Sequence, residues 1–161
     1  MNPILLATLT LILNFGYVQA ESNGSPVKSK AISLGSFEIA IPAGWLYKTV
    51  TQINMQVVTQ IFHPDKDGVF EVTSIISLPG KPTQDRMRLL TNLDSSVDLT
   101  WQKWDKLSGY QYEYTEAGKF YRQWWLTHHN KIIFAVYSSK VSDESLRNVI
   151  DDMVNSLAIS K

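Results

Sequence analysis

Two adjacent histidines, His128 and His129, are the residues of this chain best suited by type to bind a metal or to move a proton. Neighbouring residues of a strand point to opposite faces of a sheet, so both rings reach one ion only where the chain kinks. The chain has no cysteine, and no His-x-x-x-His spacing lies near the pair. We therefore expect a solvated turn over residues 128–131 and predict no metal ligand.

Asp65 and Asp67 belong to the run Asp65-Lys66-Asp67-Gly68, which has the composition of the start of a calcium loop. Such a loop requires a bidentate Glu at its twelfth position. That position is Ile76, within a run typical of a strand. The segment His63 to Gly68 therefore predicts a hairpin loop, and its two carboxylates are candidates for contact with a partner.

Nucleophilic catalysis needs a nucleophile, a base and an orienting group in contact. The chain has no cysteine and no Gly-x-Ser-x-Gly, and its three histidines all fall in predicted turns. It also has no glycine-rich phosphate loop, and its carboxylates are too scattered to propose an acid pair. We predict no catalytic residue and no cofactor; a hydrolase built on a serine and a histidine is the third alternative for function.

Aromatic side chains gather between residues 101 and 125. Trp124 and Trp125 are neighbours, so a strand turns them to opposite faces of its sheet, and the far face is either a second core or an exposed surface. Exposed tryptophan and tyrosine are typical of protein contacts and of sugar-binding faces. With the two loops above, the predicted partner-binding residues are Trp101, Trp104, Tyr112, Trp124, Trp125, Asp65, Asp67, His128 and His129.

Alternation of apolar and polar residues predicts the strands that position these side chains. The turn Pro42-Ala43-Gly44 ends the first strand, and Trp45 is expected to pack back on the core. Tyr110, Tyr112 and Tyr114 should share one face of a later strand. The predicted strands are 33–41, 55–62, 69–78, 100–107, 109–115, 120–128 and 132–138, the last four in meander order.

Two helices complete the predicted fold. The first covers 83–94, with Met87, Leu90 and Leu93 on its apolar face. The second begins after Ser142, the expected N-cap, and carries an apolar stripe from Leu146 to Leu157. The fold class is therefore α+β, with an antiparallel sheet of six to seven strands and helices packed on it.

The first twenty residues carry no charged side chain and end at Val18-Gln19-Ala20, a small-residue cleavage pattern. We predict a signal peptide over 1–20 with its cut after Ala20; an uncleaved anchor and a buried helix are the alternatives. A flexible polar lead over 21–31 and a single domain over 32–161 follow, with no stable membrane span after cleavage. The mature protein is then periplasmic or secreted.

Composition narrows the kinds of partner. Lysine plus arginine and aspartate plus glutamate number fifteen each, so the formal net charge is zero. A chain without a basic block lacks the charge that nucleic acid or an anionic membrane attracts. The absence of cysteine leaves no disulfide, so packing alone must stabilise the domain.

The opening Phe37-Glu38-Ile39-Ala40-Ile41-Pro42-Ala43-Gly44-Trp45, the strand 132–138 and the helix end at Met153 to Leu157 resemble the superfamily of PsbP-like photosystem proteins and Ran-binding import factors. The resemblance spans residues 33–158 and looks like that of small exported bacterial members. It implies a PsbP-like sandwich and a non-enzymatic role through protein contact, as an assembly factor, a chaperone or an immunity protein. A small-ligand or carbohydrate-binding module that uses exposed aromatics is the second alternative.

Overall fold

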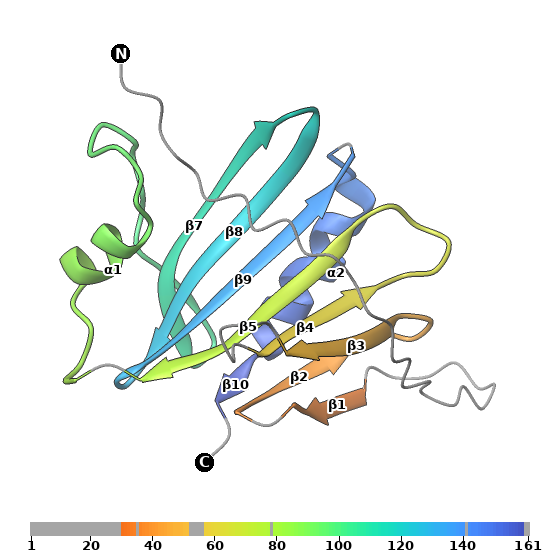
Figure 1. Cartoon of the computed structure of the whole chain (residues 1–161), viewed down its shortest axis with the longest axis horizontal. Helices are drawn as coiled ribbons and strands as arrows, with labels where there is room; N and C mark the ends of the chain where they lie inside the picture. The colour runs from red at the N-terminus through yellow and green to blue at the C-terminus, as the bar shows by residue number, and fades with distance from the viewer. Residues whose placement is uncertain (1–29, 35, 52–56, 78, 141, 160–161) are drawn as a thin grey trace.

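The computed structural model describes residues 30–34, 36–51, 57–77, 79–140 and 142–159. Within them, a seven-stranded antiparallel sheet has the order β3-β4-β5-β9-β8-β7-β6, and a smaller sheet has the order β1-β2-β10 (Figure 1). The strands of the large sheet are β3 (Leu46–Thr51), β4 (Val57–Phe62), β5 (Val69–Ser77), β6 (Gln102–Trp104), β7 (Leu107–Glu116), β8 (Lys119–His128) and β9 (Lys131–Ser139). The small sheet comprises β1 (Lys30–Ser33), β2 (Phe37–Ile41) and β10 (Ala158–Ile159).

The main core lies between one face of the large sheet, β2 and the helix α2 (Glu144–Ser156). In Figure 1, α2 lies on the far side of the sheet. Apolar residues spaced three or four apart turn one side of α2 to the sheet, as its sequence pattern predicts. The α2 residues buried here are Leu146, Ile150, Met153 and Val154.

A tight hairpin fixes the register of β7 and β8. Ala117 and Gly118 both have positive φ, 49° and 74°, as a two-residue turn with right-handed strand twist requires. The turn pairs Glu116 with Lys119, and every later pair follows from it. Side chains then alternate, so Tyr110, Tyr112 and Tyr114 share one face of β7, as the sequence predicts.

The hairpin loop predicted between β4 and β5 is present over residues 63–68. Gly68 has φ 119°, and a Cβ placed on it would overlap the ring of Tyr137. Glycine is required here because the loop lies against the end of β9. Trp45 is buried in the core, as predicted from the turn that precedes it.

The helix α1 (Gln84–Leu90) is shorter than the predicted 83–94. It ends at the cap Thr91, and Asn92 takes the left-handed conformation with φ 54°. Met87 is buried as predicted, but Leu90 is 38% exposed, so the apolar face is narrower than the sequence indicates. Arg88 donates to the carbonyls of Asp94 and Val97, which ties the following segment back to the helix.

Three other sequence predictions need correction. The expected strand 33–41 contains only the last residue of β1 and the whole of β2, which pairs back on β1, and Leu34 N donates to Phe37 O between the two strands. The expected strand 100–107 contains only the three residues of β6 and then the turn at Asp105, whose φ is 42°. The N-cap of α2 is Asp143, whose carboxylate accepts the N–H of Ser145, instead of Ser142.

Strands β3 and β10 were not expected. β10 pairs with β2 after α2 returns the chain to it. The predicted signal peptide and most of the polar lead lie outside the described residues, although Lys30 and Ala31 of that lead belong to β1. No helix in the described ranges is long and apolar enough to cross a membrane.

Candidate functional site

A row of tyrosines occupies the sheet face opposite α2. Tyr114 stacks on Tyr112 with ring centroids 5.9 Å apart, and on Tyr121 at 5.0 Å. Gln123 holds two of them: Tyr112 donates its hydroxyl to Oε1, and Nε2 donates to the Tyr114 hydroxyl at 2.7 Å. All four side chains are half-buried. We call Tyr112, Tyr114, Tyr121 and Gln123 the tyrosine face.

The hydroxyls of Tyr112 and Tyr114 stay protonated over the physiological range. Burial raises the pKa of Tyr112. Burial, with the neighbouring Tyr112, Glu116 and Tyr121, raises the pKa of Tyr114 to about 12. The face therefore offers flat, uncharged rings and hydroxyl groups that can donate and accept hydrogen bonds.

One end of this sheet face forms a second core. Met87 of α1 packs there with Tyr110 and Ile132, and Trp101 and Trp125 lie against them partly buried. The ring centroids of Trp101 and Tyr110 are 5.0 Å apart, and those of Trp125 and Phe134 are 4.7 Å apart. Both alternatives for the far face therefore hold in part, since α1 covers this end and the tyrosine face stays half-exposed.

Trp104 and Trp124 belong to the main core. Trp124 has no exposed surface, and the Arg122 guanidinium lies 4.8 Å from its ring centroid. Trp124 and Trp125 thus face opposite sides of the sheet, as predicted. Of the tryptophans predicted to bind a partner, Trp101 and Trp125 are half-buried and keep some exposed surface. Trp104 and Trp124 are buried, so they support the surface from within the core and do not contact a partner directly.

Asp65 and Asp67 lie in the loop between β4 and β5 and are both exposed. The carboxylate of Asp67 accepts the N–H of Lys140 at 2.5 Å, and its carbonyl accepts the Tyr137 hydroxyl at 3.4 Å. These bonds fasten the loop to the end of β9. In the described part of the chain, no group of three or more histidine or acidic side chains is placed to hold a metal ion.

His128 and His129 line an open cleft of about 360 Å³ at the end of β8 that leads into the turn to β9. His128 lies on the α2 side of the sheet, because every second residue of a strand points to the same face and Trp124 and Leu126 point to that side. Its Nδ1 is 2.8 Å from the carbonyl of Lys106, and its ring centroid is 4.1 Å from that of His129. The predicted site residues therefore fall in separate places and form no single site.

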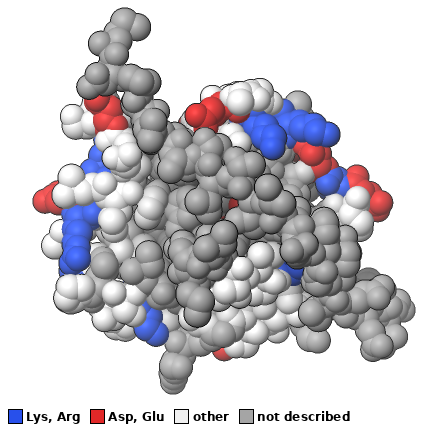
Figure 2. Space-filling view, viewed as in Figure 1, with Lys and Arg blue, Asp and Glu red and all other residues white. Residues whose placement is uncertain are grey.

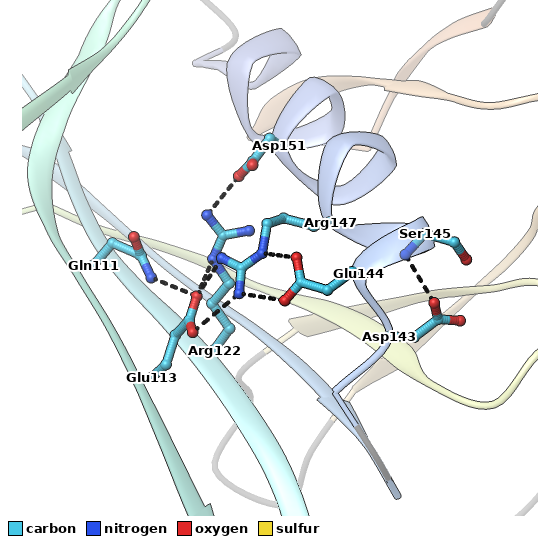
Figure 3. A network of polar contacts seen from close by, with 8 residues as sticks. All are labelled: Gln111, Glu113, Arg122, Asp143, Glu144, Ser145, Arg147 and Asp151. Carbon is cyan, nitrogen blue, oxygen red and sulfur yellow. Dashed lines mark hydrogen bonds and ion pairs between the residues drawn. The ribbon is translucent and has the colours of Figure 1, made fainter.

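An ion-pair network joins β7 and β8 to α2 (Figure 3). Arg122 contacts Glu113 at 3.2 Å and Asp151 at 2.7 Å, and Arg147 pairs with Glu113 and Glu144. Burial opposes ionisation of Glu113, but the hydrogen bond from Arg147 and the charges of both arginines outweigh it and lower the pKa. These pairs join the helix to the sheet, although the buried Nε of Arg122 contacts Glu113 without the geometry of a hydrogen bond.

Sequence reasoning missed several residues that the structure brings to these places. Tyr114 is two residues from Tyr112 on the same strand, so the strand pattern already predicts that the two side chains share a face. Tyr121 and Gln123 join the face only through the pairing of β7 with β8. The backbone carbonyl of Lys106, in the turn before β7, contacts His128, and no local sequence pattern predicts that contact.

No protein-family model matches the chain, and the search of curated proteins finds no match. Among solved structures, a protein of Bacteroides thetaiotaomicron has a similar fold, with a TM-score of 0.55 and 16% identity over 78% of this chain. The match spans 45% of that longer protein. The cyanobacterial PsbP of Synechocystis is similar with a TM-score of 0.42 and 13% identity, over 88% of this chain and 98% of that one. The similarity to the Bacteroides protein concerns the fold alone.

Proposed function

We propose that this chain is an exported, non-enzymatic protein that binds another protein through the tyrosine face. The observation that carries this proposal is the row of half-exposed, mutually stacked tyrosine rings on the sheet face opposite α2. Figure 2 looks onto the same side and shows described lysine, arginine, aspartate and glutamate side chains around its outline. Uncharged, aromatic side chains are typical of the centre of a protein contact.

The rigidity of the rings favours binding. Ordering a flexible side chain at an interface costs roughly 0.5–1.5 kcal/mol, and a side chain already held avoids much of that cost. Tyr112 and Tyr114 are held by Gln123 and by stacking before any partner arrives. Tyrosine is also among the residues enriched where binding energy concentrates.

The contacts of two of the three histidines support a role without catalysis. His63 accepts the N–H of Asp65 on Nδ1 at 3.1 Å, and its ring packs edge-on against Trp45. His128 uses its Nδ1 on a backbone carbonyl. Both Nδ1 atoms therefore contact backbone groups, whereas a general base is directed at a nucleophile.

Export rests on the uncharged residues 1–20 and the cleavage pattern at Ala20. Within the binding class, an assembly factor, a chaperone for a secreted effector and an immunity protein differ in the partner that they hold. The identity of the partner separates these roles.

The test is affinity capture with the tagged mature chain, starting at Glu21, from the periplasmic fraction of its host, with quantification by mass spectrometry. The binding variant carries Tyr114→Thr and Tyr121→Thr, since threonine keeps the strand preference but removes the rings. The matched control is Tyr47→Thr, a half-buried tyrosine whose cross-strand neighbour Ile61 is in the main core. Melting curves must first show that each variant folds.

A protein held in near-equal amount by the wild type and by the control, and lost from the double variant, supports the proposal. Equal recovery by all three chains places binding elsewhere on the molecule. Recovery of the chain alone argues against a resident protein partner.

A further inference from the structure

A second surface lies on the other face of the sheet and at its other end. It is the cleft of about 360 Å³ between the turn before β7, the turn between β8 and β9, and β10. Pockets for small molecules range over about 300–1,000 Å³, so this cleft is at the small end of that range. Its lining residues are Lys106, Leu107, His128, His129, Asn130, Lys131, Ala158 and Ile159.

The polar part of the lining has one sign of charge. Two lysines, Lys106 and Lys131, are among the lining residues, and the other polar lining residues are His128, His129 and Asn130. Among the described residues that line the cleft, none is an aspartate or a glutamate. Asp105 precedes Lys106 in the turn but is outside the lining. A cavity lined by donors and cations attracts an anion.

The hydrogen bond of His128 fixes the role of its ring. Carbonyl oxygens only accept, so the Nδ1 that lies 2.8 Å from the Lys106 carbonyl carries a proton and donates. Nε2 of the neutral ring then accepts hydrogen bonds only, so an anionic head must be held by other groups. The bond ties the backbone of the turn at Lys106 to β8, which fixes the positions of the two hairpins that line the cleft.

The remaining lining is apolar. Leu107 is buried beneath the cleft, and Ala158 and Ile159 of β10 are half-buried beside it. Ile159 also packs against the main core. An anion that is entirely polar would leave these walls unused, whereas a short apolar body would cover them.

We propose that this cleft binds a small organic anion, with its carboxylate or phosphate head at Lys106 and Lys131 and its apolar body against Leu107 and β10. The proposal does not rest on protein binding by the tyrosine face, because the two surfaces share no residue. It assigns the chain a ligand site that stays accessible when a protein partner occupies the tyrosine face.

The test is a titration of the ¹⁵N-labelled mature chain with octanoate, followed by amide chemical shifts. We expect shifts at residues 106–107, 128–131 and 158–159, with the tyrosine face unchanged. Hexyl phosphate should reproduce them. Inorganic phosphate, which lacks the apolar body, and 1-octanol, which lacks the charge, should each bind much more weakly.

Lys106→Glu should weaken octanoate at least about tenfold, the loss of one hydrogen bond to a charged group. The matched control is Lys119→Glu, the same charge change at the exposed far end of β8, which should leave affinity unchanged. Lys131→Glu, at the other lysine proposed to contact the head, should weaken octanoate binding in the same way and supplies a second variant in case Lys106→Glu does not fold.

Three results would overturn the proposal. They are octanoate shifts outside the cleft, equal weakening by Lys106→Glu and Lys119→Glu, and equal affinity for octanoate and inorganic phosphate. The last would show that the apolar walls contribute nothing.

Discussion

Nη2 of Arg122 in β8 lies 2.7 Å from the carboxylate of Asp151 in α2. The pair joins the centre of the sheet to the middle of the helix, and Nε of the same guanidinium contacts Glu113. The arginine side chain is only 9% exposed, so water offers its charge little compensation. The helix therefore meets the sheet through a charge cluster as well as through its apolar stripe.

Replacing Arg122 by methionine should lower the free energy of unfolding by about 2 kcal/mol, because Glu113 and Asp151 lose a buried partner. Methionine preserves much of the packing on Trp124. Urea denaturation of the purified chain measures the change. The control Arg147→Met removes a more exposed cation and should cost about 1 kcal/mol or less. Equal effects of the two substitutions would contradict the importance of burial at Arg122.

Glu113 should make the domain less stable in acid. Its pKa in the folded chain lies below the ordinary value of 4.5, so its ionised form stabilises the fold above that pH. This contribution is lost as the pH falls from 4.5 through the lowered pKa. Glu113→Gln should therefore be less stable than wild type at neutral pH, with the difference closing in acid. Urea midpoints across this range test it, and a constant difference at every pH would refute it.

Asp143→Ala should cost about 1 kcal/mol, since its carboxylate caps the first turn of α2 through the N–H of Ser145. Ser142→Ala should change the free energy of unfolding by much less. Thermal melting of the two variants distinguishes the caps. The Ser142 substitution would prove the more costly of the two if the cap expected from the sequence were correct.

Gly109→Ala should destabilise the sheet by about 3 kcal/mol, because the new Cβ would overlap the carbonyl oxygen of Trp125. Gly118→Ala is the control. Its φ is 74°, so alanine is strained there by about 1 kcal/mol, but no atom lies within 4 Å of the added carbon. Denaturation of both variants compares backbone crowding with backbone strain, and a cheaper Gly109 substitution would show that the strand can shift.

Local patterns were reliable where one face of an element is buried along its whole length. The meander from β7 to β9 and the helix α2 were predicted within a few residues, because alternation and the 3.6-residue period repeat several times in each. β3 has no buried side chain among its six residues, so its sequence Leu46–Thr51 carried no clear alternation. α1 was predicted too long because Leu93 continued its apolar spacing past the turn at Asn92.

For the candidate sites, residue types were predictable but their grouping was not. The sequence turns Trp124 and Trp125 to opposite faces, and it aligns Tyr112 with Tyr114. It does not say that Tyr121 stacks on Tyr114, since the partner strand and its register supply that contact. Nor does it bring Lys106 beside His128, 22 residues away.

The amino-acid sequence by itself determined the class of fold, the zero net charge, the alternation of β7 and the apolar stripe of α2, because these depend on local periods of the chain. Only the tertiary structure decided which sheet face α2 covers and which aromatic side chains stay half-exposed. It also decided that two lysines and two histidines share one cleft. Those outcomes depend on contacts between segments far apart in the chain, whose choice follows from packing the whole core.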